Sequence, residues 1–276
     1  MTDALIAVED LHHEYPGGVL ALAGVSLEIR PGESIGIIGQ NGSGKTTFVK
    51  HLNGLLRPTR GRVVVAGQDT RKVTVGQLAR TVGYVFQNPD HQIFAGRVWD
   101  EVSFGPKNLG LRGADLEQTV RGALETMGLT DLVERHPYTL SRGQRQRLAI
   151  ASVLSMRSQV LVLDEPMGGQ DRAQVGRLLA TMASLRATGH TTIMVSHDLE
   201  IIGASCERAI VFRGGRIILD GPVRDVFAQT EQLQQTFLKA PQIARFSLAR
   251  NLPRVALTVD EACELLDGIA DQASIP

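Results

Sequence analysis

Cysteine is scarce in this sequence: its 276 residues include only Cys206 and Cys263. The two cysteines lie far apart and have neither the paired spacing nor the nearby histidines of a zinc site. Few and unpaired cysteines fit a reducing cytoplasm. We therefore expect no structural zinc, and we interpret both residues as ordinary buried thiols.

An excess of either charge is also missing, because 29 basic side chains balance 29 acidic ones. A chain of this kind has no overall positive field that would draw it to nucleic acid or to anionic lipid. We therefore expect no nucleic-acid partner, and any contact of that type would have to be local.

Long hydrophobic runs are absent as well. Although 43% of the residues are hydrophobic, unbroken apolar stretches such as Val160–Leu163 are far too short to cross a bilayer. The N-terminal sequence MTDALIAVED lacks the basic segment and following apolar run of a signal peptide. The sequence therefore predicts a chain that is neither exported nor membrane-spanning. It also contains no internal repeat, low-complexity tract or long heptad run.

The chain does contain enough hydrophobic residues for one sizeable core with a small second unit beside it. Two kinds of strand are predicted. Alternating apolar and polar residues mark the first kind, at Ile6–Val8, Ser26–Ile29 and Arg62–Val65. Nearly unbroken apolar residues, typical of buried parallel strands, mark the second kind, at Ile35–Ile38, Val160–Leu163 and Thr192–Val195.

Helical patterns follow two of the buried strands, at Lys45–Asn53 and Ala173–Ala187. This alternation of strand and helix predicts an α/β fold with a covered parallel sheet. Between Pro89 and Met156 the sequence favours helices, notably Leu116–Met127 and Gly143–Ser155, and we interpret this region as a helical insert. Short helical candidates separated by prolines follow Gly221 and predict a small C-terminal helical extension, at Asp225–Gln229, Gln232–Lys239, Gln242–Ala249 and Val259–Leu266.

A phosphate-binding motif, G-x-x-x-x-G-K-[ST], is matched by Gly39, Gln40, Asn41, Gly42, Ser43, Gly44, Lys45 and Thr46. A buried strand precedes the motif and a helical pattern follows it, as a phosphate loop requires. Its glycines let backbone N–H groups surround the phosphate oxygens, and Lys45 supplies a positive charge. The helix start directs its positive dipole end at the phosphates, and the Thr46 hydroxyl can bind Mg²⁺. We predict that the motif, together with Thr47, binds ATP, with Mg²⁺ as cofactor.

Two carboxylates, Asp164 and Glu165, end the buried strand Val160–Leu163, where open α/β sheets bind their ligands. Asp164, next to the apolar strand, is suited to hold Mg²⁺ through water. Glu165 is suited to polarise the water that attacks the γ-phosphate. Acidic residues at strand ends are often only solvated loop residues, but the phosphate loop upstream favours the catalytic interpretation.

A second candidate phosphate-binding segment is Leu140-Ser141-Arg142-Gly143-Gln144, at the start of a predicted helix. Ser141 is a possible N-cap, and Gly143 allows a close backbone approach. This segment resembles the Leu-Ser-Gly-Gly-Gln signature of the ATP-binding cassette (ABC) family, with Arg142 in place of the first glycine. The resemblance covers residues 5 to about 221.

The resemblance implies a P-loop NTPase (RecA-like) core with an N-terminal antiparallel β portion and an inserted α-helical subdomain. It places the ABC nucleotide-binding domain at residues 1–221, with the core at 1–88 and 157–221, the helical subdomain at 89–156, and the extension at 222–276. In that family the signature of one subunit closes over ATP bound to another subunit. The resemblance therefore implies a dimer in which Ser141, Gly143 and Gln144 contact the partner's nucleotide.

Several further residues match family positions one by one. Tyr15 matches the aromatic residue that stacks on adenine, and Gln87 matches the glutamine that senses Mg²⁺ and the transport subunit. His197 matches the switch histidine that contacts the γ-phosphate, and Asp171 matches a dimer-contact aspartate. The other histidines have no such support and are interpreted as ordinary structural residues. Besides Arg142, the chain departs from the family at Met167, Gly168 and Gln170.

One branch of the family is indicated by the segment from Val85 to Phe94 and by Val102-Ser103-Phe104-Gly105-Pro106. These segments, Asn108-Leu109-Gly110 and the extension around Ala240–Arg245 are similar to energy-coupling factor (ECF) ATPases, which import vitamins or transition-metal ions. The resemblance implies three partners: a second ATPase, a transmembrane coupling subunit that docks beside Gln87, and a membrane-embedded substrate-capture subunit. It also implies a peripheral location on the cytoplasmic face of the cell membrane.

An alternative within the same chemistry is a soluble ABC ATPase that acts on DNA or ribosomes. The single cassette, the lack of a long coiled coil and the lack of a basic patch disfavour it. A GTPase or small-molecule kinase would also have a phosphate loop, but neither class explains the signature segment together with His197.

Overall fold

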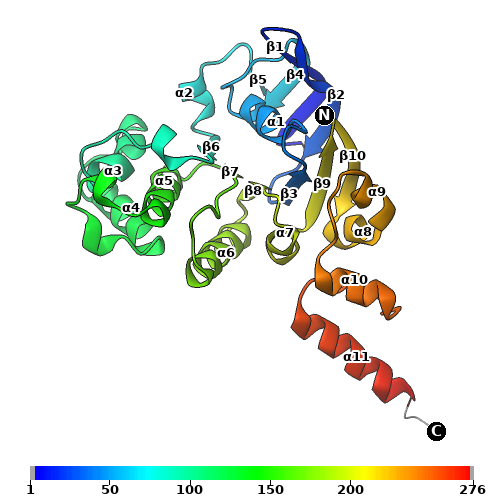
Figure 1. Cartoon of the computed structure of the whole chain (residues 1–276). Helices are drawn as coiled ribbons and strands as arrows, with labels where there is room; N and C mark the ends of the chain where they lie inside the picture. The colour runs from blue at the N-terminus through cyan, green and yellow to red at the C-terminus, as the bar shows by residue number, and fades with distance from the viewer. Residues whose placement is uncertain (1–3, 274–276) are drawn as a thin grey trace.

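The structure is a computed structural model, and it describes residues 4–273. Two sheets form its centre (Figure 1). The first is antiparallel, with strand order β2-β1-β4-β5. Its strands are β1 (Ile6–Tyr15), β2 (Val19–Ile29), β4 (Arg60–Val65) and β5 (Gln68–Asp69).

The second sheet has six strands in the order β10-β9-β3-β8-β7-β6 and is parallel except for the hairpin of β9 and β10. Its central strands carry the unbroken apolar runs and are buried along their whole length, which confirms the prediction of buried parallel strands. The strands are β3 (Ser34–Gly39), β6 (Val82–Val85), β7 (Val160–Asp164), β8 (Thr191–Val195), β9 (Arg208–Arg213) and β10 (Arg216–Pro222).

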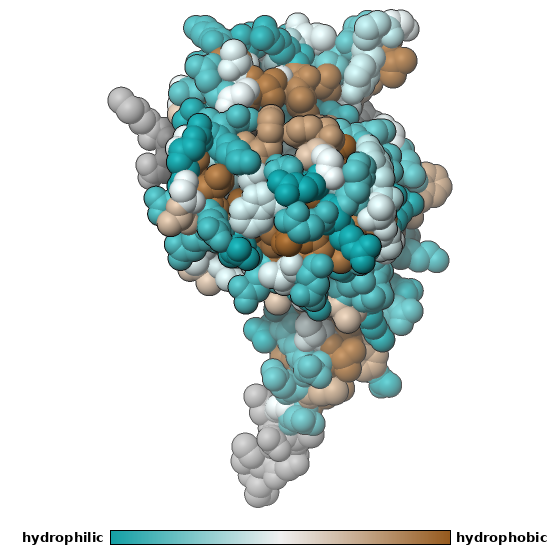
Figure 2. Space-filling model, turned by 90° about the vertical axis from the view of Figure 1, so that its left-hand side faces the viewer, coloured by the Kyte–Doolittle hydropathy of each residue, from teal (hydrophilic) through white to brown (hydrophobic). Residues whose placement is uncertain are grey.

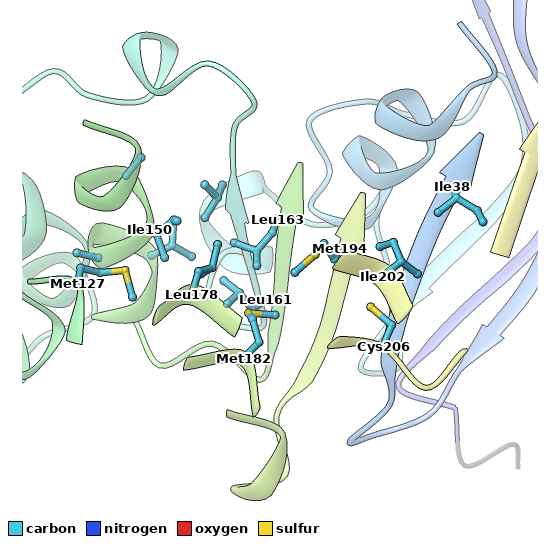
Figure 3. Packing of buried hydrophobic residues seen from close by; sticks show 14 of the residues in the cluster. Ile38, Met127, Ile150, Leu161, Leu163, Leu178, Met182, Met194, Ile202 and Cys206 are labelled. Carbon is cyan, nitrogen blue, oxygen red and sulfur yellow. The ribbon is translucent and has the colours of Figure 1, made fainter. Parts of the chain in front are cut away.

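Helices cover both faces of the parallel sheet (Figure 1). Helix α1 (Lys45–Leu52) lies between the two sheets, and α6 (Arg172–Ala187) and α7 (Leu199–Ser205) pack on the opposite face. The short α2 (Val75–Leu78) precedes β6. Figure 3 shows one continuous apolar core on the α6 side, running from Ile38 and Cys206 through Leu161 and Leu178 to Ile150 of the helical lobe.

The helical lobe occupies the position of the predicted insert and stands to one side of the sheet (Figure 1). Its helices are α3 (Val98–Asn108), α4 (Gly113–Thr126) and α5 (Arg142–Leu154), with short 3-10 turns at Pro89–His91, Thr130–Leu132 and Pro137–Thr139. The sequence patterns indicate α4 and α5 but not α3, because α3 contains Pro106 in its interior, where proline is unfavourable.

The C-terminal extension contains α8 (Val223–Ala228), α9 (Thr230–Gln235), α10 (Gln242–Ala249) and α11 (Val259–Ala273). It begins within the core, since Val223, Val226 and Phe227 of α8 are buried in the same apolar cluster as α7 and β9. Helix α11 extends away from the rest of the molecule (Figure 1). Cys263 on α11 is exposed, so the prediction that both cysteines are buried was wrong for this residue. Because α11 extends away from the rest of the molecule, no other described element covers Cys263.

Candidate functional site

Four strand ends meet at one edge of the parallel sheet. The phosphate loop follows β3, Gln87 lies two residues after β6, Glu165 follows β7, and His197 lies two residues after β8. Since these strands are parallel neighbours or near neighbours, their carboxyl ends bring the predicted residues to one crevice.

The phosphate loop needs glycine where the backbone turns sharply. Gly44 caps α1 in the left-handed region, with φ of 106° and no room for a side chain: a Cβ atom would lie 2.7 Å from the Ala21 carbonyl oxygen. This turn leaves the first N–H groups of α1 unpaired within the helix and directed at the crevice, which is the arrangement that binds phosphate.

Lys45 lies within the phosphate loop. Its Nζ donates to the carbonyl oxygens of Gly39 and Gln40, each at 2.8 Å. Burial lowers the pKa of Lys45, while the negative charges of Glu165 and Asp164 act in the opposite direction. The ammonium group therefore stands as the positive centre of a crevice that also contains two carboxylates.

The oxygen donors predicted for Mg²⁺ lie side by side. The Thr46 hydroxyl donates to Asp164 Oδ1 at 3.2 Å, and the Asp164 side chain is almost fully buried. Mg²⁺ prefers hard oxygen ligands and is usually bound by one or two protein groups together with substrate phosphates and water. Within residues 4–273, no cluster of three or more His, Cys, Asp or Glu side chains could hold a metal alone. Thr46 and Asp164 thus fit a magnesium ion that binds with the nucleotide and neutralises charge on its phosphates.

The candidate catalytic carboxylate is held in place from two sides. His197 Nδ1 donates to Glu165 Oε2 at 2.8 Å, and the Glu165 backbone N–H donates to the Val195 carbonyl at 2.9 Å. Glu165 adopts φ of 48°, which is unfavourable for a non-glycine residue. The chain therefore turns sharply after Asp164, and the two neighbouring carboxylates have different partners: Asp164 accepts from Thr46 and Glu165 accepts from His197.

The base-binding end of the crevice is formed by β1, β2 and α1. Tyr15 and Thr47 are joined by a hydrogen bond of 3.1 Å between their hydroxyls. A cavity of about 460 Å³ runs from Tyr15 along the phosphate loop to Gln87 and Glu165. The structure thus brings Tyr15, residues of the phosphate loop, Gln87 and Glu165 to one cavity of a size that suits a nucleotide.

A neighbouring cavity of about 480 Å³ adjoins the phosphate loop and contains Gln87, Glu165 and His197. Leu238, from the segment after α9, also lines it. Sequence reasoning missed Leu238, since a lone leucine some seventy positions beyond Glu165 carries no motif. The extension therefore reaches the edge of the candidate site.

Two histidines behind the site were interpreted as ordinary structural residues, and they form a buried pair. His51 Nδ1 donates to the Thr47 carbonyl at 2.8 Å, so its Nε2 must accept from His13 Nδ1, at 3.1 Å. The His13 ring also contacts the Tyr15 ring edge-on, with centroids 4.5 Å apart. The pair thus connects the adenine end of the site to α1 from inside the core.

The signature segment does not join this crevice. Ser141 caps α5: its Oγ accepts from Gln144 N at 3.3 Å, and Gln144 Oε1 accepts from Ser141 N at 2.8 Å. Gly143 packs against the segment that follows Glu165, and Asp171 caps α6 by accepting from Gln174 N at 2.9 Å. None of these four predicted residues lines either cavity beside the phosphate loop.

Comparison with known proteins gives the same family as the site. Residues 22–168 match the model of the ABC transporter family. A putative ABC transporter ATP-binding protein of Caldanaerobacter subterraneus subsp. tengcongensis is 43% identical over 94% of this chain, which spans 45% of that relative's length. The cobalt import ATP-binding protein CbiO of Rhodobacter capsulatus is 41% identical, with 89% of each chain covered.

Solved structures are similar over most of the chain. The cbiO1 protein of Clostridium perfringens, part of the ABC transporter complex cbiONQ, has a TM-score of 0.74 at 33% identity and covers 91% of this chain and 100% of its own. A dimeric post-hydrolysis state of an ATP-binding cassette bound to ADP and Pi has a TM-score of 0.73 at 26% identity and covers 79% and 99% of the two chains. The phosphate loop, the paired carboxylates and these similarities agree: the chain belongs to the ABC transporter family and forms its ATPase cassette.

Proposed function

We propose that this chain is the ATP-hydrolysing subunit of an ECF-type importer of a vitamin or transition-metal ion. The observation that carries the proposal is the juxtaposition of Glu165 and His197 with the phosphate loop, while the signature segment faces elsewhere. Similarity to the cobalt import protein CbiO and to cbiO1 supports the transport class and the branch.

In the proposed reaction, water attacks the γ-phosphate in line with the leaving oxygen. Glu165 accepts the proton of this water, and the His197 hydrogen bond keeps the Glu165 carboxylate oriented toward it. Lys45 and the N–H groups at the start of α1 offset the charge on the phosphate oxygens. Thr46 and Asp164 would hold Mg²⁺, which would neutralise part of the negative charge on the phosphates.

Completion of the site requires a second cassette, either a copy of this chain or a related one. Ser141, Gly143 and Gln144 lie at the start of α5, where the Ser141 side chain is exposed, and they are away from their own chain's cavities, so this helix start could contact a nucleotide held by a partner. The solved dimeric cassette with ADP and Pi supports this arrangement by similarity. ATP binding would close the dimer, and hydrolysis would reopen it.

The groove next to Gln87 is the proposed docking site for a transmembrane coupling subunit. Phe86 lines this groove together with four exposed apolar side chains, at Leu55, Val75, Phe94 and Phe104. The rings of Phe94 and Phe104 contact each other edge-on at 4.8 Å. Figure 2 views the molecule from the side of the helical lobe and shows apolar surface between polar regions on that face. Such surface suits an apolar helix of a membrane partner.

No helix within residues 4–273 has the length and apolar character of a membrane span. The proposed transport role therefore depends on the coupling subunit and on a membrane-embedded substrate-capture subunit. With these partners the chain would be held at the cytoplasmic face of the cell membrane.

The test is affinity purification of the tagged chain from gently solubilised membranes, followed by mass spectrometry. We expect integral membrane proteins to co-purify with the wild type. These proteins should be lost with Phe94→Asp, which places a charge in the groove. They should be retained with the control Phe246→Asp, because Phe246 is a partly exposed residue on α10, away from the groove lining. Recovery of ribosomes or DNA-repair proteins instead of membrane proteins would reject the transporter proposal in favour of a soluble ABC ATPase.

A further inference from the structure

Asp164 is held by two hydroxyl groups, one on each carboxylate oxygen. Thr46 donates to Oδ1 at 3.2 Å, and Tyr84 donates to Oδ2 at 2.8 Å. A single donor would leave the carboxylate free to turn about its last torsion, whereas donors on both oxygens define its plane. Of the two hydroxyls, only that of Thr46 belongs to the phosphate-loop motif.

Tyr84 reaches Asp164 from the neighbouring strand. It lies on β6, which pairs with β7, and its side chain is buried. Its hydroxyl therefore reaches Asp164, the last residue of β7, from inside the core.

The other side of Tyr84 faces the docking groove. Its ring packs edge-on against Phe86, with centroids 4.9 Å apart. Tyr84 and Phe86 both line the groove with Phe94 and Phe104. One side chain thus contacts the candidate metal carboxylate through its hydroxyl and the groove through its ring.

We propose that Tyr84 is a positioning residue for Mg²⁺, which orients Asp164 and links that orientation to the groove through Phe86. The inference rests on the proposed function, because the metal would bind with the nucleotide. Loss of an outer hydrogen bond to a metal ligand typically lowers metal affinity about 10- to 100-fold. The hydroxyl of Tyr84 should therefore affect metal-dependent binding and leave metal-free nucleotide binding unaffected.

The first experiment compares the wild type with Tyr84→Phe, which removes the hydroxyl and keeps the ring. Mn²⁺ serves as the probe: free Mn²⁺ is titrated by electron paramagnetic resonance in the presence of ADP. We expect Tyr84→Phe to weaken Mn²⁺ binding about tenfold, while its affinity for ADP in EDTA stays within the error of the wild-type value and its thermal unfolding stays cooperative. Tyr138→Phe is the matched control, because Tyr138 is exposed on the 3-10 turn Pro137–Thr139 and should leave both affinities unchanged.

Equal Mn²⁺ affinity in the wild type and Tyr84→Phe would overturn the inference. So would an equal loss of ADP affinity in EDTA, because that result would indicate general damage to the site. If the wild type itself binds no ADP, the proposed function fails first, so the two failures are distinguishable.

The link to the groove is tested by a double-mutant cycle with Phe86→Ala. In the presence of Tyr84, loss of the Phe86 ring should weaken Mn²⁺ binding, because the hydroxyl loses its support. In the Tyr84→Phe background the same change should have little effect, since no hydroxyl remains to be placed. Additive effects on Mn²⁺ affinity would overturn the proposed link.

Discussion

Glu165 illustrates how a single residue can depend on an unfavourable backbone conformation. Its φ of 48° lies in the left-handed region, and two hydrogen bonds, from His197 and to Val195, hold the turn. Strain of this kind persists where the surrounding structure fixes it, and it often occurs at functional sites. The strain separates Glu165 from Asp164, so that adjacent acidic residues can serve a reacting water and a metal ion.

The proposed role of Glu165 as the base leads to a direct prediction. Glu165→Gln keeps the size of the side chain and removes its ability to accept a proton, so steady-state ATP hydrolysis should fall on the order of a hundredfold or more. ATP affinity, measured by calorimetry, should change little because Lys45 and the phosphate loop are intact. Near-normal turnover in this variant would reject Glu165 as the base.

The buried histidine pair predicts a pH dependence of stability. Burial lowers the pKa of His51 from 6.5 to about 4. Above pH 6.5 the imidazole is neutral in the folded and unfolded states, but between these two pKa values the unfolded chain binds the proton first. Folding stability is therefore lost as the pH falls through this window. Between about pH 7.5 and about pH 5 the loss from His51 should be about 2 kcal/mol.

Urea unfolding at both pH values, for the wild type and for His51→Gln, measures this contribution. The variant should lose less stability on acidification than the wild type, because glutamine does not titrate. His190→Gln, at a partly exposed loop position, is the control and should behave as the wild type does. Identical pH dependence in the wild type and His51→Gln would contradict the assignment of His51 as a neutral core residue.

At the scale of elements, α5 shows how helix capping and close packing place the signature segment. The reciprocal hydrogen bonds of Ser141 and Gln144 begin the helix, and Gly143 in its first turn contacts the segment between Glu165 and α6. The Arg142 side chain lies over Gly169, with its Cδ 3.3 Å from where a Gly169 Cβ would be. The arginine that replaces the family glycine is thus accommodated by a glycine in the neighbouring loop.

Gly143→Ala tests the close contact at the start of α5. A Cβ atom there would lie 2.8 Å from the Gly169 carbonyl oxygen and 3.1 Å from Gln174 Oε1, so one of the two segments must move. We expect ATP hydrolysis at saturating ATP to fall at least about tenfold, since misplaced positioning groups lose much of their effect. The nucleotide affinity of isolated chains should stay unchanged, because Gly143 is outside their own cavity. Wild-type turnover in the variant would show that this contact is not needed.

For the whole molecule, the extension has two parts with different relations to the core. Helix α8 buries Val223, Val226 and Phe227 in the main apolar cluster, whereas α11 leaves Val259 and other apolar side chains exposed. The boundary proposed between residues 221 and 222 therefore separates two parts of the sequence, but the apolar core continues across it into α8. The exposed apolar surface of α11 suits contact with a second subunit.

Two truncations test this difference. A chain ending at Thr258 loses α11 and should keep its fold, with a thermal midpoint within a few degrees of the full chain. A chain ending at Pro222 also loses α8 and should be destabilised by more than about 3 kcal/mol, because burial of Phe227 and its neighbours is lost. Solubility and thermal unfolding measure both outcomes. A stable chain ending at Pro222 would show that the core does not need α8.

Local motifs could be predicted from the sequence because their chemistry depends on residues that are adjacent in the chain. The loop from Gly39 to Thr46 requires glycines and a lysine at fixed offsets, and the acidic pair ends an apolar strand, so both were predicted together with the α/β fold. The prediction was weaker for β1 and β2, which are longer than their alternating segments because bulges break the period. Strands β5, β6, β9 and β10 were not predicted.

Only the tertiary structure decided which distant residues meet. Tyr84 reaches Asp164 because β6 pairs with β7, and His13 reaches His51 because β1 lies over α1. The order of strands in a sheet is set by packing of the whole chain, so spacing in the sequence cannot give these pairs. The same packing holds the signature segment away from its own phosphate loop. By itself the sequence determined the ATP chemistry, since the phosphate loop binds through adjacent backbone groups. The fold decided which distant side chains orient the catalytic residues and where the signature segment lies, because these positions depend on the packing of the whole chain.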